Sequence, residues 1–432
     1  MKFFFSRSML EEILSGQNVY KALKQVQANK GSGGIDNMQT EELPEYMSMH
    51  WRKLKASIIA GSYKPSPVKK VEIPKPGGGK RMLGIPTVLD RVIQQAIAQW
   101  LSPKCDGEFC EHSYGFRLKR NAHQAVYQAQ QFLNEGRTWI VESDLEKFFD
   151  KVNHDKLMSL IEKKTGDKRT LRLIRQYLQS GIMEGGLVSP RREGTPQGSP
   201  LSPLLSNIML NELDKELQQR GHKFVRYADD CSIYAGSGKA ANRTAASITA
   251  YIEKKLKLKV NREKTKVSRP SASTLPGFSF YRSKSGMEIR ISSKAIGRIK
   301  ARLKAKTKRS DPANPTVKIK QLDTIIRGWV NYFVIAKAKS IMQQPDKMVD
   351  VRLRIGEWKR WKSTKTKVRK LIGLGAAKRQ AYQWGNSSKS YCRAAHSPVL
   401  QTTLNSRYWR KQGHVGFYNY YYWQTKHQTK VF

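Results

Sequence analysis

The tetrapeptide Tyr-Ala-Asp-Asp at residues 227–230 places two acidic residues side by side between two short β-prone runs, 223–227 and 231–235. This pattern predicts a tight hairpin with both carboxylates at its tip. Adjacent carboxylates repel each other, and a divalent cation such as Mg²⁺ offsets that repulsion. An Asp pair by itself is more often a solvated turn, because Asp favours turns through local hydrogen bonds to the backbone. The rest of the sequence must therefore decide between an ordinary turn and a metal site.

A large excess of basic residues indicates the class of partner. The 432 residues include 80 Lys and Arg against 34 Asp and Glu, which gives a formal net charge of +46. Such a surface repels itself unless a polyanion is its usual partner, and nucleic acid is the obvious candidate. Residues 291–432 hold 32 Lys and Arg but five Asp and Glu, and no acidic residue follows Glu357. Because a solvated charged face usually mixes both signs, this stretch is interpreted as a nucleic-acid surface.

Cysteine spacing and hydropathy point to an intracellular protein. The four cysteines form no Cys-x-x-Cys pair and no zinc-like spacing with the eight histidines, so we expect free thiols, a reducing compartment and no zinc. The apolar run at residues 3–5 is too short for a signal sequence, and no run of about 18 apolar residues is present. The sequence therefore predicts a soluble cytoplasmic protein with no membrane partner.

Hydrophobic periodicity predicts helices interleaved with short strands, an α+β fold of two to four domains. The expected strands cover residues 68–74, 82–85 and 138–145, in addition to the two strands of the hairpin. The expected helices cover residues 8–27, a segment that begins at Pro86, residues 202–219, and three basic helices at 294–308, 318–338 and 348–361.

A third carboxylate from a separate segment is required for two-metal phosphoryl transfer. Asp144, at the end of the strand over 138–145, is the natural candidate, and the backbone carbonyl of Leu145 could also bind a metal. Phe148 and Phe149 follow closely and could form a wall for the sugar of a nucleotide. The alternative is an acidic residue that ends a strand beside two core phenylalanines, and this segment alone does not decide between them.

Two further segments have the composition of nucleotide-binding loops. Gly and Pro surround Gln197 and Gly198 just before a predicted helix, so a rigid turn could hold the amide side chain against a nucleotide or a template base. Lys75 and Arg81 flank a Gly-rich turn, and their spacing lets both cations converge on one face of a hairpin. Cations on a glycine hinge suit a triphosphate that must enter and leave.

In this order, the segments resemble the blocks of a reverse transcriptase, and in particular of a bacterial group II intron reverse transcriptase/maturase. An amino-terminal arm with a Gly-rich loop at 29–36, and Ile326–Phe333, which is similar to the thumb or maturase signature of that family, point to this branch. The resemblance covers nearly the whole chain. The blocks are residues 74–81, 112–117, the strand with Asp144, 194–207, the hairpin with the Asp pair, 258–266 and 275–278.

The resemblance implies a right-hand polymerase, with fingers and a palm built on an antiparallel sheet, followed by an all-α thumb and a small basic C-terminal domain. Residues 1–60 would be a helical extension of the fingers with a Gly-rich basic loop, and residues 61–290 would form the fingers and palm. Residues 291–365 would form the helical thumb, or maturase X domain. Residues 366–432 would form a basic DNA-binding region.

The resemblance also implies the catalytic residues. Asp144, Asp229 and Asp230 would form the metal-binding triad, together with the carbonyl of Leu145. The cofactor would be two Mg²⁺ ions, for which Mn²⁺ could substitute.

Further residues receive implied roles in binding nucleotide, primer, template and RNA. Phe149 would be the steric gate whose ring crowds a 2′-hydroxyl and so favours dNTPs. Arg117 would either stabilise the fingers or reach the template strand. The implied nucleotide-binding residues are Lys75, Arg81, Phe149, Gln197 and Gly198; the primer and template residues are Arg117, Tyr227 and Gly277; and the RNA- and DNA-binding residues of the thumb are Arg327, Trp329 and Tyr332.

Some features depart from the family pattern. The chain has Leu275-Pro276-Gly277-Phe278 where Phe-Leu-Gly-Phe is common, and it lacks the frequent proline after Arg117, so the local primer and template geometry stays open. The paired Cys-x-x-Cys motifs of a zinc-ribbon-like endonuclease are missing, so we do not expect second-strand cleavage. The aromatic residues at 416–423 are expected to pack mostly in a helical core, with Arg407, Arg410 and Lys411 on phosphates.

Three functions remain open. The first is an RNA-directed DNA polymerase of a mobile group II intron that also acts as a maturase in splicing and retrohoming. Its partners would be the parent intron RNA, an RNA template with a DNA primer, a DNA target site and dNTPs, in the bacterial cytoplasm near the nucleoid. The second is an RNA-binding splicing factor without polymerase activity, against which the intact triad argues. The third is a retroelement-derived reverse transcriptase recruited to defence or repair.

Overall fold

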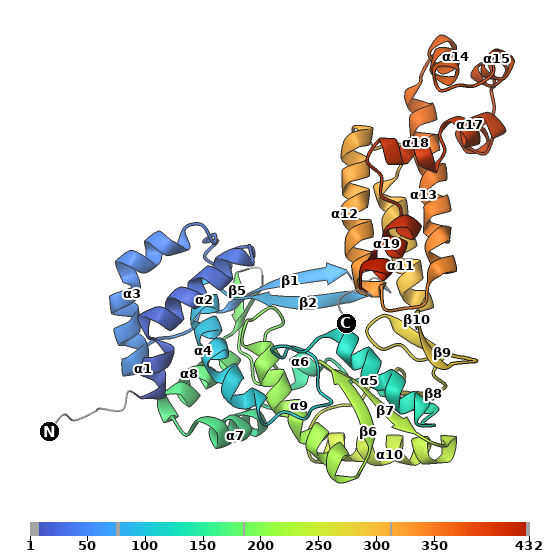
Figure 1. The fold of residues 1–432 in the computed structure, drawn as a ribbon. Helices are drawn as coiled ribbons and strands as arrows, with labels where there is room; N and C mark the ends of the chain where they lie inside the picture. Colours follow the sequence, from blue (N-terminus) through green and yellow to red (C-terminus); the bar gives the residue numbers. More distant parts are fainter. Residues whose placement is uncertain (1–7, 75–77, 185, 312, 429–432) are drawn as a thin grey trace. The chain divides into compact units, whose positions relative to one another are not determined.

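The structure is a computed structural model that describes residues 8–74, 78–184, 186–311 and 313–428 (Figure 1). The chain divides into two compact units, Met1–Pro276 and Gly277–Phe432, with a mixture of helices and short strands in the first and mainly helices in the second. None of the helices in the described ranges is long and apolar enough to cross a membrane. The four cysteines all lie in these ranges and are free thiols, as predicted.

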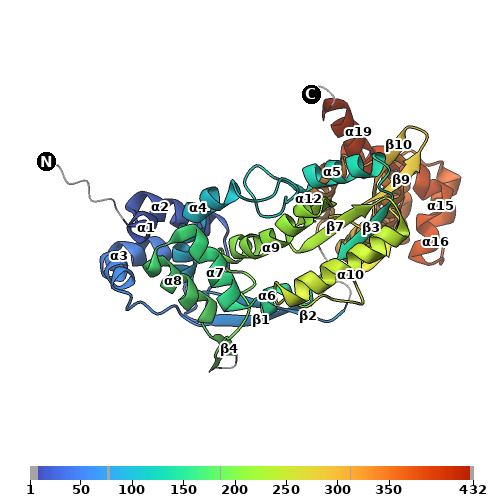
Figure 2. The same cartoon turned by 90° about the horizontal axis from the view of Figure 1, so that it is seen from below.

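The first unit contains a four-stranded antiparallel sheet with the order β6-β7-β3-β8. Its register pairs Tyr227 with Asp230 across the hairpin and Ser143 with Cys231 in the centre of the sheet. Helix α10 runs along β3, β7 and β8 (Figure 2), while α5 and α9 pack on β6. The strands are β3 (Trp139–Ser143), β6 (Lys223–Tyr227), β7 (Asp230–Ala235) and β8 (Lys266–Ser268).

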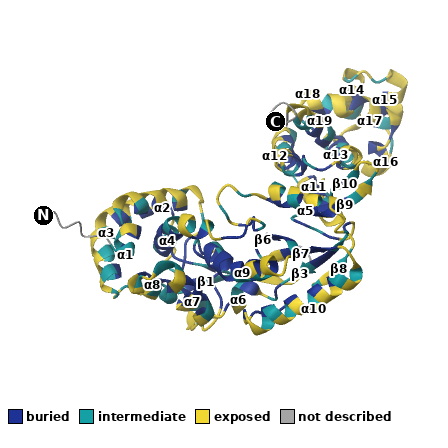
Figure 3. Ribbon diagram, turned by 60° about the horizontal axis from the view of Figure 1, so that its bottom comes forward, coloured by how far each residue is buried: buried dark blue, intermediate teal, exposed yellow. Residues whose placement is uncertain are grey.

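A second sheet of this unit has the order β2-β1-β4-β5, in which β1 pairs antiparallel with β2 and parallel with β4. Buried residues follow α9 and the central strands of the first sheet (Figure 3). The strands of the second sheet are β1 (Val68–Pro74), β2 (Lys80–Ile85), β4 (Ile182–Glu184) and β5 (Leu187–Ser189). The helices of this unit are α1 (Met9–Ile13), α2 (Gly16–Ala28), α3 (Leu43–Ala60), α4 (Val88–Asp106), α5 (Ala122–Asn134), α6 (Phe148–Lys151), α7 (His154–Thr165), α8 (Lys168–Gln179), α9 (Ser202–Gln219) and α10 (Gly238–Lys254).

The second unit begins with the antiparallel hairpin β9–β10 and continues as helices. Its last helix is anchored by Asp346, whose carboxylate accepts hydrogen bonds from the backbone N–H groups of Phe417 and Tyr418 at 2.6 and 2.8 Å. The elements are β9 (Phe278–Ser283), β10 (Gly286–Ile291), α11 (Ser293–Lys306), α12 (Pro315–Phe333), α13 (Lys339–Arg360), α14 (Thr364–Gly373), α15 (Lys378–Gly385), α16 (Tyr391–Ala395), α17 (Pro398–Thr403), α18 (Ser406–Lys411) and α19 (Phe417–Gln428).

Most predicted elements are present, with three differences in the helices. The helix expected over 318–338 begins at Pro315 and ends at Phe333. The helix expected over 8–27 is broken into α1 and α2, because Ser15 adopts an extended conformation and is the N-cap residue of α2. The helix expected from residue 348 begins at Lys339 and includes Pro345, a residue at which a sequence pattern usually ends a helix. In α19 the aromatic residues divide between two faces, since Phe417 and Tyr421 are buried while Tyr422 and Trp423 are about half exposed.

Candidate polymerase site

The acidic pair lies at the hairpin between β6 and β7. Asp229 is in the two-residue turn, and Asp230 is the first residue of β7. Tyr227 pairs with Asp230, so Ala228 and Asp229 form the tip. Ala228 has φ of +59°, a left-handed conformation that is unfavourable for a residue with a Cβ atom. The turn therefore holds a locally strained backbone directly beside its carboxylates, and the surrounding structure has to stabilise it.

Asp144 approaches this turn from the neighbouring strand. Strand β3 ends at Ser143, which pairs with Cys231, so Asp144, the residue that follows β3, lies beside Asp230, the first residue of β7. The backbone of Asp144 is fixed by hydrogen bonds in which its N–H donates to the Thr265 hydroxyl at 3.2 Å and its carbonyl accepts from the Asn261 N–H at 2.9 Å. The sheet register thus explains how acids 85 and 86 positions apart in the chain meet.

A cleft of about 1140 Å³ collects the predicted acidic residues with most of the predicted nucleotide-binding residues. Basic side chains from the segment at 259–264 line the same cleft. The members predicted from the sequence are Arg81, Asp144, Leu145, Phe149, Gln197, Asp229 and Asp230.

The pKa of Asp230 is raised to about 6. The Asp230 residue is exposed to solvent, but the protein atoms packed around it still desolvate it partly, and this partial desolvation is the main cause of the raised pKa. The carboxylates of Asp229 and Asp144 raise the pKa further, and Lys264 opposes them. The Lys264 Nζ lies 3.6 Å from Asp144 Oδ2. Ionisation of Asp230 is therefore less favourable than that of an isolated Asp until positive charge is added beside it.

The carboxylates of Asp144, Asp229 and Asp230 line one cleft, but their oxygens do not converge on a common position. Within the residues that the structure describes, no three His, Cys, Asp or Glu side chains are arranged to hold an ion as they stand. Asp144 instead directs one oxygen towards Lys264. The donor set still fits a divalent cation chemically, since Mg²⁺ prefers carboxylate and carbonyl oxygens and these carboxylates lack sufficient positive charge.

Two of the predicted nucleotide-binding residues, Arg81 and Gln197, contact each other in the cleft. Arg81 Nε donates a hydrogen bond to Gln197 Oε1 at 2.5 Å, which joins the β1–β2 hairpin to the loop before α9. Gly198 has φ of +111°, and a Cβ atom there would lie 3.2 Å from the Gly84 carbonyl oxygen, so the close approach requires glycine. Lys75 lies outside the described residues.

The predicted primer and template residues have different environments. The Arg117 guanidinium is buried and pairs with Asp106 at 2.7 Å, and it also donates to the backbone carbonyls of Cys110 and Ser113. These contacts favour the stabilising role expected for Arg117 over a contact with the template. Tyr227 precedes the turn and is partly exposed.

The remaining predicted residues belong to the second unit. Gly277 has φ of +85° and packs against the ring of Phe333. Trp329 and Tyr332 join an aromatic cluster with Phe333, at ring centroid separations of 4.7 and 4.8 Å. Arg327 is exposed and lies over the ring of Tyr420.

Sequence reasoning missed two features of the site. Lys264, which faces Asp144, belongs to the recognised block at 258–266, but its spacing alone did not indicate a carboxylate partner. Arg226 precedes the acidic motif by one residue and is completely buried with Asp214. A charged residue inside an otherwise apolar strand was the available signal, because Arg is rarely fully buried unless it is paired.

Comparison with known proteins defines the class of this chain. Residues 73–294 match the family model described as reverse transcriptase (RNA-dependent DNA polymerase), and this range contains every residue that lines the cleft except Glu72. The chain therefore belongs to the reverse transcriptase family. Residues 296–372 match the maturase-specific domain of group II introns, so within that family the chain is a group II intron reverse transcriptase/maturase.

The chain is also similar to individual proteins over part of its length. Protein YkfC of Escherichia coli is 32% identical over 272 residues, which are 54% of this chain and 71% of that protein. The group II intron-encoded protein LtrA of Lactococcus lactis subsp. cremoris is 35% identical over 208 residues, 48% of this chain and 34% of LtrA. A solved structure described as a partial Cas6-RT-Cas1–Cas2 complex aligns with a TM-score of 0.38 and 25% identity over 58% of this chain and 43% of that chain. The alignment with LtrA therefore covers about a third of the length of LtrA.

Proposed function

We propose that the protein is an RNA-directed DNA polymerase that extends a primer 3′-hydroxyl with dNTPs and also binds its parent group II intron RNA as a maturase, in splicing and retrohoming. The observation that carries the polymerase proposal is the cleft in which Asp144, Asp229 and Asp230 lie with Arg81, Phe149 and Gln197. Carboxylates, a phosphate-binding cation and an aromatic wall in one cleft are the groups that nucleotidyl transfer requires.

The proposed catalytic residues would hold two Mg²⁺ ions, or Mn²⁺ in their place. Asp144, Asp229, Asp230 and the carbonyl of Leu145 are the proposed ligands, and Asp144 would exchange its Lys264 contact for a cation. The ions would supply the charge that activates the primer hydroxyl and stabilises the leaving pyrophosphate. The carboxylates of this chain would fix the positions of those charges.

The incoming dNTP is proposed to lie along the other wall of the cleft. Arg81 would contact the triphosphate together with Lys75, while Gln197 and Gly198 would lie near the nucleotide and the template. Arg81 donates a hydrogen bond to Gln197, so the two side chains limit each other's conformations. Tyr227 and Gly277 are proposed to support the primer end.

The function is tested by single-primer extension on an RNA template. The purified chain is expected to extend a DNA primer with dNTPs in Mg²⁺, to stop when the metal is removed with EDTA, and to resume when Mg²⁺ is restored. An RNA template is compared with a DNA template of the same sequence. Failure to extend the primer on RNA in either Mg²⁺ or Mn²⁺ would refute the proposed polymerase.

Replacement of the proposed steric gate is expected to change sugar selection. In Phe149→Ala, the ratio of kcat/KM for a dNTP to that for the matching rNTP should fall by about tenfold or more, because the ring no longer crowds the 2′-hydroxyl. Phe149→Tyr keeps the ring and is the matched control, with an expected ratio near that of the wild type. A dNTP-to-rNTP ratio of kcat/KM that is unchanged in Phe149→Ala would show that Phe149 is not the steric gate.

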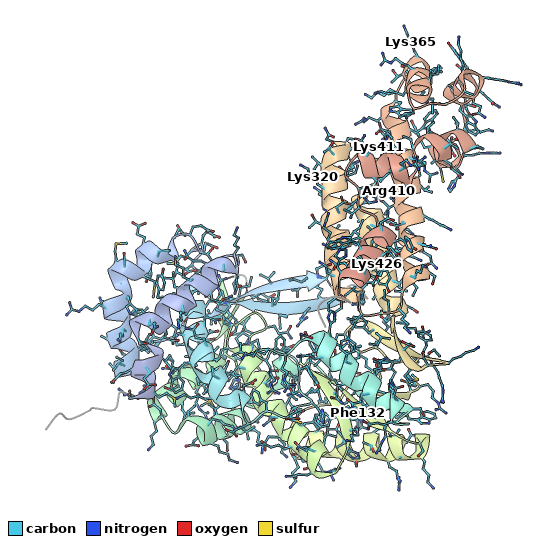
Figure 4. All side chains as sticks on the ribbon, in the orientation of Figure 1. Phe132, Lys320, Lys365, Arg410, Lys411 and Lys426 are labelled. Carbon is cyan, nitrogen blue, oxygen red and sulfur yellow. The ribbon has the colours of Figure 1, made fainter. Side chains whose placement is uncertain are left out.

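The second unit is proposed to bind nucleic acid through its basic helices. Figure 4 shows Lys320, Lys365, Arg410, Lys411 and Lys426 on these helices, and all five are exposed. Arg327, Trp329 and Tyr332 are proposed to act in the thumb, and residues 366–432 are proposed to bind DNA. The lack of any acidic residue after Glu357 supports this, because no carboxylate in that stretch competes with phosphate for the cations.

RNA affinity is expected to fall steeply with salt. Each phosphate neutralised by Lys or Arg releases counterions, so the logarithm of the binding constant should decrease linearly with the logarithm of salt concentration. Fluorescence anisotropy with a labelled structured RNA, titrated between about 50 and 200 mM salt, measures the slope. Substitution of a phosphate-contacting lysine, tested with Lys365→Gln, should reduce the slope by about one. A slope near zero would contradict the basic-surface proposal.

A further inference from the structure

A buried ion pair lies directly beneath the acidic turn. Arg226 is in β6, next to Tyr227, and Asp214 is in α9; both side chains are 0% exposed. Arg226 Nε lies 2.7 Å from Asp214 Oδ1, and Arg226 Nη2 lies 2.6 Å from Oδ2. The two parallel contacts form the bidentate arrangement that fixes both the position and the plane of a guanidinium.

The rest of the guanidinium holds the turn and the groups around it. Arg226 Nη1 donates to the Ala228 carbonyl oxygen at 2.8 Å and to Asn207 Oδ1 at 3.0 Å. Nη2 also donates to the Ser113 hydroxyl at 2.7 Å. A guanidinium has five N–H donors, and these contacts give every one of them an acceptor. The side chain therefore has a single allowed placement.

The bond to Ala228 acts on the strained part of the turn. The Ala228 carbonyl belongs to the peptide that joins Ala228 to Asp229, so a donor fixed there sets the orientation of the backbone that carries the first carboxylate. Ala228 is in the left-handed region, an unfavourable conformation that persists only where neighbouring groups enforce it. Arg226 supplies such a group.

A second segment supports the turn from the side. The backbone N–H of Arg226 donates to the His112 carbonyl, and the N–H of Tyr114 donates to the Arg226 carbonyl, both at 2.9 Å. The segment then passes so close to the turn that a Cβ atom on Gly115 would lie 2.1 Å from the Ala228 nitrogen. The turn is thus held by backbone packing as well as by the guanidinium.

A buried ion pair usually contributes little to the net stability of the fold. The cost of removing both charges from water often exceeds the gain from pairing them, and hydrophobic replacements of similar volume are frequently neutral or stabilising. The arrangement of Arg226 is better explained by the geometry that it imposes, since one of its donors reaches the Ala228 carbonyl of the acidic turn.

We propose that Arg226 and Asp214 are positioning residues that fix the Ala228–Asp229 peptide and thereby hold Asp229 and Asp230 in the arrangement needed for nucleotidyl transfer. The inference deepens the proposed function and rests on it for its catalytic part. Asp214 fixes the guanidinium, the guanidinium fixes the turn, and the turn presents the carboxylates. Neither residue of the pair would contact substrate.

The conservative substitution Arg226→Lys tests the proposal. Lysine keeps the positive charge for Asp214, but a single ammonium cannot place separate in-plane donors on Asp214, Ser113 and the Ala228 carbonyl. We expect kcat for single-nucleotide addition to fall by about ten- to a hundredfold, with the Kd for primer–template within about twofold of wild type. Arg220→Lys is the control, because Arg220 forms an exposed ion pair with Glu216 on the same helix that carries Asp214.

Hydrogen–deuterium exchange gives a readout that does not depend on activity. In metal-free protein, the amides of a peptide covering residues 224–232 should exchange at least about tenfold faster in Arg226→Lys than in wild type, because the turn opens more often. Peptides from α10 should be unchanged in Arg226→Lys. In the control Arg220→Lys the peptide covering residues 224–232 should exchange as in wild type, and α10 is left out of that comparison because Arg220 contacts Ser247 and Tyr251 on it. Exchange and kcat that both equal the wild-type values would overturn the proposal.

A double substitution covers the case in which the single variant does not fold. Arg226→Met with Asp214→Leu removes both charges together, so no unpaired charge remains buried. The proposal expects a folded protein with rapid exchange in the turn and a similar loss of kcat, whereas wild-type exchange and kcat would contradict it. If the wild type itself shows no primer extension, the polymerase proposal fails, and the exchange comparison still tests whether the pair holds the turn.

Discussion

Replacement of Asp229 by alanine is expected to abolish primer extension while leaving RNA binding intact. Asp229 is at the tip of the hairpin, within the cleft that also contains Asp144 and Asp230. Loss of one proposed ligand removes the charge that would hold a divalent cation at the reacting phosphate, and we expect kcat to fall by about 10³-fold or more. Single-turnover addition of one dNTP to a labelled primer measures this loss, and anisotropy measures RNA binding on the same preparation.

The matched control for this substitution is Asp155→Ala. The Asp155 side chain is 83% exposed and pairs with Arg175 on the surface of the same unit, so its removal changes the net charge equally without touching the cleft. Primer extension by this variant should equal that of wild type. Activity in Asp229→Ala within a fewfold of wild type would show that the assigned carboxylate is not part of the reaction.

Replacement of Gly115 by alanine is expected to displace the acidic turn. The added Cβ atom would lie 2.1 Å from the Ala228 nitrogen and 2.8 Å from its Cα atom, and both are backbone atoms that cannot rotate away. Overpacking of this kind typically costs about 1–3 kcal/mol and shifts the backbone. We therefore expect a lower midpoint of thermal unfolding and, at a temperature where the variant is folded, a loss of kcat of about a hundredfold.

Gly107→Ala separates this steric effect from the general effect of removing a glycine. Gly107 is the C-cap residue of α4 with an ordinary helical φ of −63°, and no described atom lies within 4 Å of a Cβ atom built there. Calorimetry and primer extension should both give wild-type values for this control. A Gly115→Ala protein that unfolds at the wild-type temperature and polymerises at the wild-type rate would show that the close packing against the turn is not required.

The hairpin and the helix of the site could be predicted because each is determined by residues that are adjacent in the sequence. The hairpin follows from two β-prone runs around a two-residue turn, and α9 has the predicted bounds because its apolar residues keep a helical period. The composition of the loop around Gln197 and Gly198 indicated a constrained turn, and Gly198 indeed has a positive φ. These features depend on neighbouring residues in the sequence, which is why one sequence was sufficient.

The contacts that support the turn could not be predicted in the same way. Arg226 and Asp214 are close in sequence, but their pairing requires α9 to pack on β6, and the contacts with Ser113 and Gly115 join segments more than 100 positions apart. The Lys264 contact with Asp144 depends on the pairing of β3 with β8. Such contacts are set by tertiary packing, for which a single sequence carries no periodic signal.

If Asp144, Asp229 and Asp230 bind the divalent ions proposed for nucleotidyl transfer, Fe²⁺ substituted for Mg²⁺ should cleave the chain beside them, because hydroxyl radicals cut the backbone next to the bound ion. We expect cuts near residues 144 and 229 that excess Mg²⁺ suppresses and that disappear in Asp230→Asn. Cuts confined to other segments, or cuts near 144 and 229 that are the same in Asp230→Asn, would contradict the proposed metal site.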